Sequence, residues 1–288
     1  MKKILKLFLT AVIFAVVLCI GFSYVRNFVL LSEYNAESIY VYNVTDDREE
    51  LNINGEERRA PASLVKIMTV YVALQNIKDL SAIASIDRTS YLNSVKNNAS
   101  MAGFVSNETT TFRDLLYGTM LASGGECANS LAINISGHID TYVKKMNRQA
   151  ADFHMDDTNY KNVEGLDEEG EYTTARDVAT LIRHSIKDGN FRAIFTRPYY
   201  LSTKTADHPG GLGISSTVLS KLKDFNYSGF KIIGGKSGTT GEAGLCWATL
   251  AIKEGKEYIV VVMGAPEGDM KKPEQGQIED TIKILEEL

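Results

Sequence analysis

The sequence is poor in the residues that build disulfide frameworks and soft-metal sites. Among 288 residues there are only three cysteines and four histidines. The cysteines, Cys19, Cys127 and Cys246, form no CxxC pair, and the histidines stand in unrelated contexts without an HExxH pattern. This pattern excludes a disulfide scaffold and favours ordinary surface or partly buried histidines over a metal site.

The sequence also has no excess of positive charge. Lysine and arginine total 31 against 36 aspartates and glutamates, which gives a net charge of −5. Because phosphate binding usually needs a basic face, this balance argues against nucleic acid as a partner. Only five prolines occur, and there is no internal repeat or low-complexity tract. With 44% hydrophobic and 23% charged residues, the composition is that of a globular protein with a sizeable core.

Only one long hydrophobic run occurs, and it lies near the N-terminus. Leu7 to Val25 carries no charge and, as a helix, would span roughly 28 Å, close to the thickness of a bilayer core. Three lysines precede the run and Arg26 alone follows it, which favours a cytoplasmic N-terminus and an exported remainder. A cleaved signal peptide is the competing interpretation, although residues 21–23 resemble a cleavage site only weakly.

We therefore expect two parts in the chain. Residues 1–30 form an N-terminal membrane anchor or signal segment, and residues 31–288 form a single folded domain. The domain is expected at the extracytoplasmic face of the cell membrane, with cleavage and secretion as the second choice.

The exported part has strand patterns at both ends and a helical middle. β-Branched and aromatic residues predict a first strand over 36–44 and a return strand over 50–53. Helical patterns follow over residues 64–74, 111–121, 126–135, 140–153 and 174–187. Three apolar runs predict strands over residues 230–236, 245–253 and 257–263. A final helix is predicted over residues 273–288. This order predicts an α/β (α+β) fold in which the terminal segments pair in a mostly antiparallel sheet flanked by helices.

The first motif with chemical meaning is Ser63-Leu64-Val65-Lys66. Pro61 marks a helix start, so Lys66 lies one helical turn after Ser63 on the same face. A serine hydroxyl needs a base within hydrogen-bond reach to act as a nucleophile. A lysine becomes such a base when burial lowers its pKa, and the apolar helix that follows predicts burial. Taken alone, however, an S-x-x-K pattern arises by chance in most chains of this length.

The third motif in chain order is Lys236-Ser237-Gly238-Thr239-Thr240, at the end of an apolar strand. A lysine followed by small hydroxyl residues and glycine can hold a carboxylate while the strand edge pairs with an extended substrate. Taken alone, the same residues also fit a glycine-rich turn with a solvated lysine.

The second motif in chain order, Ser123-Gly124-Gly125, lies between two predicted helices. Its serine could pass a proton between Lys66 and a leaving group. Taken alone, it is a helix-capping turn.

The order of the three motifs is more specific than any one of them. S-x-x-K, a central serine and K-[ST]-G are the signature of penicillin-binding proteins and serine β-lactamases. The sequence resembles the low-molecular-weight penicillin-binding proteins, the serine D-alanyl-D-alanine carboxypeptidases. The resemblance extends over roughly 36–265, with its strongest segments at 61–69, 98–103, 114–118, 159–177, 234–240 and 262–265. It implies a β-lactamase/DD-peptidase-like fold with a helical subdomain.

The resemblance implies a role for each catalytic residue. Ser63 would be acylated by the penultimate D-Ala of a peptidoglycan stem peptide, which releases the terminal D-Ala. Lys66 would be the base for that attack, and Ser123 would relay the proton to the leaving group. Water would then free the acyl-enzyme. The backbone N–H groups of Ser63 and Thr239 would form the oxyanion hole, and no metal or organic cofactor is needed.

The resemblance also implies the substrate-binding residues and the partners. Lys236 would bind the terminal carboxylate of peptides ending in D-Ala-D-Ala, and β-lactams would be covalent inhibitors. The remaining residues of this edge would be Ser237, Gly238, Thr239, Thr240 and Gly125.

Three departures from the family pattern bear on function. The second motif usually ends in asparagine, and here Gly125 stands in its place. Ser237 replaces the more usual threonine and keeps a hydroxyl. The chain stops at Leu288, so we expect no C-terminal β domain, and membrane attachment would come from the N-terminal segment.

Two alternatives share the same motifs. A serine β-lactamase would need a glutamate for deacylation, and Glu164 is the candidate by position. A wall-peptide or penicillin sensor would keep the acylated serine but lose turnover through Gly125. Release of D-Ala, compared with hydrolysis of penicillin, separates these possibilities.

Overall fold

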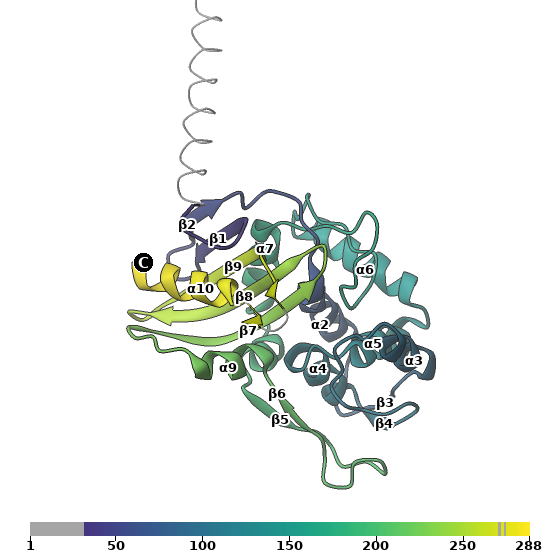
Figure 1. Ribbon diagram of the computed structural model, residues 1–288. Coiled ribbons are helices and arrows are strands. Elements are labelled where there is room, and N and C mark those ends of the chain that lie inside the picture. The colour runs from purple at the N-terminus through teal and green to yellow at the C-terminus, as the bar shows by residue number, and fades with distance from the viewer. Residues whose placement is uncertain (1–31, 270–271, 274) are drawn as a thin grey trace, which may run out of the picture.

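The computed structural model describes residues 32–269, 272–273 and 275–288. Five strands form one antiparallel sheet in the order β2-β1-β9-β8-β7. Their bounds are Ser38–Asn43 (β1), Arg48–Ile53 (β2), Phe230–Thr240 (β7), Gly244–Lys253 (β8) and Lys256–Ala265 (β9). Tyr40 of β1 pairs with Val261 of β9, so segments from the two ends of the domain lie side by side (Figure 1). The predicted fold class and the pairing of the terminal segments are confirmed.

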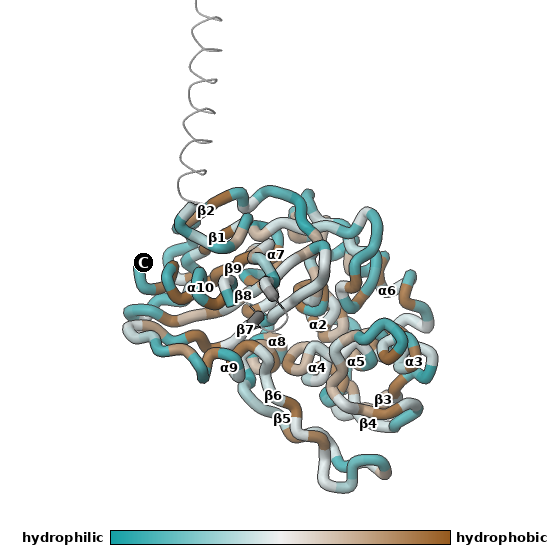
Figure 2. Tube along the Cα trace, viewed as in Figure 1, coloured by the Kyte–Doolittle hydropathy of each residue, from teal (hydrophilic) through white to brown (hydrophobic). Residues whose placement is uncertain are grey.

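The sheet is buried on both faces, because its central strands alternate between two hydrophobic clusters. Val260 and Val262 of β9 pack with α10 (Gly276–Glu287) and α9 (Thr217–Lys221). Ile259 and Val261 point the other way, into the cluster that contains α7 (Ala175–Ser185) and the helical subdomain. Figure 2 shows the matching alternation of hydrophobic and hydrophilic segments along α10. Because successive side chains of a strand point to opposite faces, the apolar strands bury both faces of the sheet, and helices cover each face.

The helical subdomain is built around α2, which spans Val65–Asn76. Buried residues occur on every side of this helix, a pattern typical of a helix at the centre of a domain. Its neighbours are α4 (Phe112–Leu121), α5 (Gly125–Ser136), α6 (Ile139–Asp152) and α8 (Gly189–Phe195). The first turn of the buried helix therefore presents its residues at the boundary between the sheet and the helical subdomain.

Several short elements were not predicted from the sequence. They are β3 (Ile83–Ser85), α3 (Arg88–Lys96), β4 (Thr109–Thr111), α8 (Gly189–Phe195), β5 (Tyr199–Leu201), β6 (Gly213–Ser215), α9 (Thr217–Lys221), β10 (Gly268–Asp269) and β11 (Lys272–Pro273). Two 3-10 turns, η1 (Ala62–Leu64) and η2 (Leu222–Asp224), complete the set. The β5–β6 hairpin and its loop project from the body beside α4 (Figure 1).

The predicted membrane anchor or signal segment lies outside the described residues. Within 32–269, 272–273 and 275–288, no helix is long and apolar enough to cross a bilayer. Cys127 and Cys246 are both buried free thiols.

Candidate active site

Ser63 and Lys66 form a hydrogen-bonded pair at the start of the buried helix. Ser63 lies in the turn η1 and Lys66 in the first turn of α2, and the Lys66 Nζ donates to Ser63 Oγ at 3.0 Å. Ser63 remains partly exposed, whereas Lys66 is 3% exposed. The pair is therefore a serine open to solvent with a lysine enclosed behind it, the geometry that an activated nucleophile requires.

Burial makes Lys66 a better base at neutral pH than an ordinary lysine. Desolvation lowers the pKa of Lys66 to about 8, and the negative charges of Glu164, Glu126 and Glu171 oppose this effect. The neutral amine is thus accessible close to physiological pH. This confirms the burial of Lys66 that the apolar helix predicted.

Ser123 and Lys236 form a second hydrogen-bonded pair. The Lys236 Nζ donates to Ser123 Oγ at 2.9 Å and to the Ser237 carbonyl at 2.6 Å. Lys236 has no exposed surface, and burial lowers its pKa well below the usual value, with Lys66 and Lys221 adding to the effect. The structure thus connects the second and third motifs directly, through a contact that the sequence analysis did not specify.

The third motif is part of a strand and not of a turn. The sequence predicted the strand to end at Lys236, but β7 continues to Thr240 because pairing with β8 extends from Ser237–Trp247 to Thr240–Gly244. β7 is the last strand of the sheet, so one of its edges is not paired with another strand of that sheet. The three motifs meet at β7, because Lys236 contacts Ser123 and Gly238 lies against Ser63 N. Such an edge can accept an extended peptide by main-chain hydrogen bonds.

The hydroxyl residues of β7 differ in their surroundings. Thr239 is exposed, and Ser237 Oγ lies 3.0 Å from the hydroxyl of Thr217. Thr240 donates to Asp167 at 2.5 Å, which ties the end of β7 to the loop 156–174. Thr240 therefore supports the edge through that loop, while Ser237 and Thr239 remain available along it.

Two glycines, from β7 and from the loop 156–174, lie close to the backbone at Ala62 and Ser63. A Cβ on Gly238 of β7 would lie 2.8 Å from Ser63 N, and a Cβ on Gly165 would lie 1.9 Å from the Ala62 carbonyl oxygen. Gly165 also has a φ of +79°, which other residues rarely adopt. These contacts place Ser63 N against β7, the arrangement that the predicted oxyanion hole of Ser63 and Thr239 needs.

The reactive serines are accompanied by strained backbone. Ala62 and Ser123 have φ angles of +47° and +62°, in the left-handed region that residues other than glycine seldom occupy. Each such residue costs of order 1–3 kcal/mol and persists only where the surroundings hold it. Both strained residues lie at or next to the proposed catalytic serines.

The loop 156–174 contributes main-chain contacts to the site that the sequence does not predict. The Glu164 carbonyl accepts from Lys66 Nζ at 2.5 Å. Asn162 Oδ1 accepts from the backbone N of Glu164 at 3.0 Å, and Glu171 in turn accepts from Asn162 Nδ2 at 3.1 Å. Glu164 was considered only as the glutamate of a β-lactamase, because sequence position does not reveal a main-chain contact.

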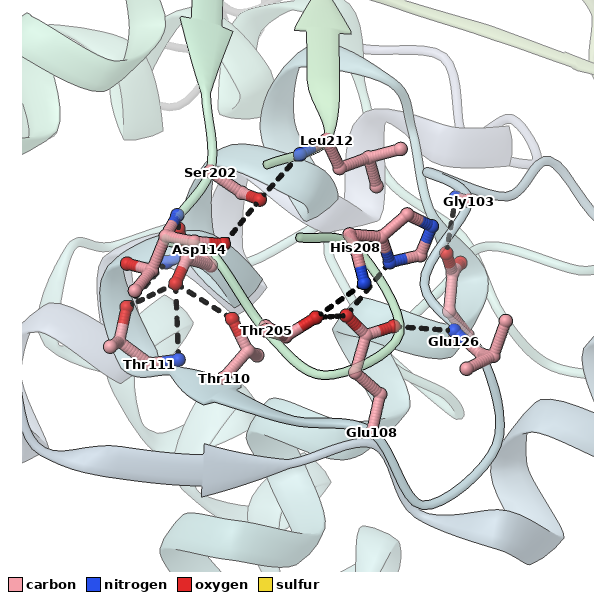
Figure 3. A network of polar contacts seen from close by, with 12 residues as sticks. Gly103, Glu108, Thr110, Thr111, Asp114, Glu126, Ser202, Thr205, His208 and Leu212 are labelled. Atoms are coloured by element: carbon pink, nitrogen blue, oxygen red, sulfur yellow. Dashed lines mark hydrogen bonds and ion pairs between the residues drawn. The ribbon is translucent and has the colours of Figure 1, made fainter. Parts of the chain in front are cut away.

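Buried carboxylates connect the segments that lie around the start of α5 (Figure 3). Glu126, in the first turn of α5, accepts from the backbone N–H groups of Ala102 and Gly103 at 2.7 and 3.0 Å. Glu108 accepts from Thr205 at 2.6 Å and contacts His208 Nδ1 at 2.8 Å. The network joins the β5–β6 loop and the segment before α4 to the helix that follows Ser123.

Asp114 fastens the base of the same hairpin. Its Oδ1 accepts from Tyr200 OH at 2.8 Å and Thr203 N at 2.9 Å. Its Oδ2 accepts from Thr110 and Thr111 (Figure 3). Burial acts to raise the pKa of Asp114, but these hydrogen bonds, those from Thr111 and Thr110 first, lower it overall. The ionised carboxylate is the form that the structure stabilises.

Metal-ligating clusters were not expected from the sequence. Among the described residues, no three His, Cys, Asp or Glu side chains are arranged to hold a metal ion.

A partly exposed serine hydrogen-bonded to a buried lysine, beside the edge strand of a sheet, is the arrangement found in a class of serine hydrolases. A family model described as D-alanyl-D-alanine carboxypeptidase matches residues 32–267, and the chain belongs to this family. The family membership expected from the three motifs is thereby confirmed.

Individual relatives agree with this assignment. The D-alanyl-D-alanine carboxypeptidase DacF of Bacillus subtilis is 34% identical over 74% of this chain and 53% of its own length. The D-alanyl-D-alanine carboxypeptidase of Streptomyces sp. strain K15 is 29% identical over 73% of this chain and 74% of its own. The crystal structure of the Streptomyces K15 DD-transpeptidase matches with a TM-score of 0.76 and 27% identity, covering 88% of this chain and 96% of that one. The chain spans about half the length of DacF.

Proposed function

We propose that this protein is a serine-type D-Ala-D-Ala carboxypeptidase that removes the terminal D-Ala from peptidoglycan stem peptides. The observation that carries the proposal is the Ser63–Lys66 pair at 3.0 Å, with a pKa of about 8 at Lys66, beside the edge strand β7. Membership of the D-alanyl-D-alanine carboxypeptidase family supports the choice of substrate.

Acylation begins when neutral Lys66 accepts the proton of Ser63. The Ser63 Oγ then attacks the penultimate D-Ala carbonyl, and the backbone N–H groups of Ser63 and Thr239 stabilise the negative charge on the carbonyl oxygen. The C–N bond breaks as the proton passes through Ser123 to the leaving amine of D-Ala. Water attacks the resulting ester, and its proton returns Ser63 to the hydroxyl form.

Lys236 prepares the site for a carboxylate. An anion that arrives beside this buried lysine favours the protonated amine, because an opposite charge stabilises the charged form. Ser237 and Thr239, along the same edge of β7, supply hydroxyl groups to hold the carboxylate. Gly238 lets β7 lie directly against the backbone of the nucleophile, since a Cβ there would be 2.8 Å from Ser63 N.

The site also accounts for an expected sensitivity to β-lactams. These compounds offer an acyl carbonyl next to a carboxylate, so they would acylate Ser63 as substrate mimics. Residues 31–288 would act as one catalytic domain, held at the extracytoplasmic face of the membrane by the apolar run in residues 1–30.

The test is release of D-Ala from a peptide ending in D-Ala-D-Ala by the full-length protein, alongside labelling by a fluorescent penicillin. We expect D-Ala release and stable labelling, both abolished in Ser63→Ala. Rapid penicillin hydrolysis with no D-Ala release would identify a β-lactamase, and labelling without release would identify a sensor. Addition of an amine acceptor shows whether the acyl group also passes to an amine, an activity named for the Streptomyces K15 neighbour.

A further inference from the structure

The place of the missing side chain at Gly125 is occupied by another residue. A Cβ on Gly125 would lie 2.4 Å from Glu164 Oε2, 3.1 Å from Ser94 Oγ and 3.4 Å from Ala99 Cβ. Gly125 lies in the first turn of α5, a conformation that any residue adopts. The backbone therefore does not require glycine here, and the side chain of Glu164 is what excludes a larger residue.

Glu164 reaches this place from the loop 156–174 and contacts the catalytic lysine at the same time. Its carbonyl accepts the 2.5 Å hydrogen bond from Lys66, and its Oε2 is buried without a hydrogen-bond partner among the described residues. Ser94 Oγ, beside the same point, is likewise buried without a partner in the described part of the chain. A buried carboxylate oxygen is seldom left unpaired, and such groups occur mainly where a reaction uses them.

The carboxylate also acts on Lys66 by charge. Glu164 is the largest of the influences that oppose the effect of burial on the pKa of Lys66. The other groups facing this lysine are Glu126 and Cys127 of α5 and Glu171 of the same loop, and the neighbouring lysine is Lys236 of β7. Each of the acidic groups favours the charged form of Lys66, and the charge of Lys66 in turn helps to lower the pKa of Lys236.

We propose that Glu164 is a positioning residue for Lys66 that replaces the side chain missing from the second motif. In this arrangement Gly125 and Glu164 form a matched pair: the glycine makes room, and the loop supplies the polar group. The inference rests on the proposed function, in which Ser63 is the nucleophile and Lys66 its base. Glu164 exchanges no atoms with the substrate, since its effect is on the orientation and protonation of the amine.

A first experiment removes the charge at constant shape. Penicillin acylation and D-Ala release are measured from pH 5.5 to 9.5 for Glu164→Gln and for the control Glu169→Gln, which neutralises an exposed carboxylate in the same loop. We expect the acid limb of kcat/KM to move to lower pH by about one unit in Glu164→Gln. The plateau should fall about tenfold through kcat, with little change in KM, while Glu169→Gln matches wild type. Coincident pH profiles for the three proteins would overturn the proposal.

A second experiment exchanges the two groups. Gly125→Asn alone should reduce acylation at least tenfold, because the new side chain and Glu164 compete for one space. Glu164→Ala clears that space, so the double variant should recover acylation to within a few-fold of wild type. If the double variant is no better than Gly125→Asn, the two positions do not form a pair and the proposal fails.

The two experiments also separate this inference from the proposed function. A wild-type protein that releases no D-Ala, or that keeps its activity in Ser63→Ala, would refute the function itself. An active wild type with an inactive Ser63→Ala, combined with unmoved pH profiles and no recovery in the double variant, would refute only the role of Glu164. Thermal unfolding of each variant shows whether a loss of activity comes with a loss of fold.

Discussion

Substitution of Gly165 tests how the loop 156–174 supports the nucleophile. Gly165 has a φ of +79°, and a Cβ there would lie 1.9 Å from the Ala62 carbonyl oxygen and 2.9 Å from Ser63 N. Gly165→Ala therefore combines two costs. Left-handed backbone in a residue with a Cβ costs roughly 1–2 kcal/mol, and overpacking against a fixed backbone adds about 1–3 kcal/mol.

Gly170 of the same loop provides a matched control. Its φ is +80°, but a Cβ there would meet only the flexible end of the Lys161 side chain, at 3.3 Å. Gly170→Ala thus carries the backbone strain without the collision. We expect Gly165→Ala to be about 1–3 kcal/mol less stable than Gly170→Ala, or about 3 °C in Tm for each kcal/mol.

The effect on function should exceed the effect on stability. If the loop moves to relieve the collision, the Glu164 carbonyl leaves Lys66, and the first turn before α2 loses its support. Stopped-flow labelling with a fluorescent penicillin should then show acylation at least tenfold slower in Gly165→Ala than in Gly170→Ala. Equal Tm values and equal acylation rates for the two variants would show that the contact at Ala62 does not hold the site.

Three further predictions concern titrating groups. Because neutral Lys66 is the base and its pKa is about 8, acylation should rise nearly tenfold per unit from pH 6 to 7 and level off above about 8, and a flat profile in stopped-flow labelling would exclude this role. Burial raises the pKa of Glu171 to about 7, so the folded state holds its proton more tightly than the unfolded state. The free energy of unfolding should therefore fall by about 2 kcal/mol as the pH rises from about 4.5 to 7. In thermal unfolding at several pH values, Glu171→Gln should remove this pH dependence. An unchanged pH dependence in the variant would contradict the assignment to Glu171. Asp114 has a lowered pKa, so its contribution to the stability of the folded state is present at neutral pH and lost in acid. In denaturant titrations at neutral pH, Asp114→Asn should lower the free energy of unfolding by about 2–3 kcal/mol. An unchanged free energy of unfolding would mean that the hydrogen bonds of Asp114 do not hold the β5–β6 hairpin.

The sequence predicted the elements whose side chains have a strong hydrophobic period. β1, β8 and β9 lie at the predicted positions, because their apolar residues are buried on the sheet. α2 was predicted as a buried helix because it is apolar on every side. Short or polar elements carry no such signal: α3 has only Ser90 and Ser94 buried, and its Leu92 is exposed. Such elements depend on packing between distant segments, which a local pattern does not contain.

The end of β7 shows a different limit of prediction. Ser237, Gly238 and Thr239 have the composition of a turn, and yet they continue the pairing with β8. Strand pairing uses main-chain groups, so a residue of low strand propensity joins a ladder when its partner strand is already in place. The consequence is functional, since the hydroxyl residues lie along an edge that can pair with a peptide.

The second motif shows why a site cannot be judged from one motif at a time. From the sequence, Gly125 is the loss of a side chain that the family usually has, and this loss alone favours a weakened enzyme or a sensor. In the structure, Glu164 fills the same place from a loop and contacts Lys66 through its carbonyl. A polar side chain therefore still occupies this place, but its hydrogen-bonding capacity differs. A carboxylate only accepts hydrogen bonds, whereas the carboxamide of an asparagine also donates them. It follows that Gly125 by itself does not predict a loss of activity, and that only the exchange of both residues, Gly125→Asn with Glu164→Ala, tests this part of the site as a unit.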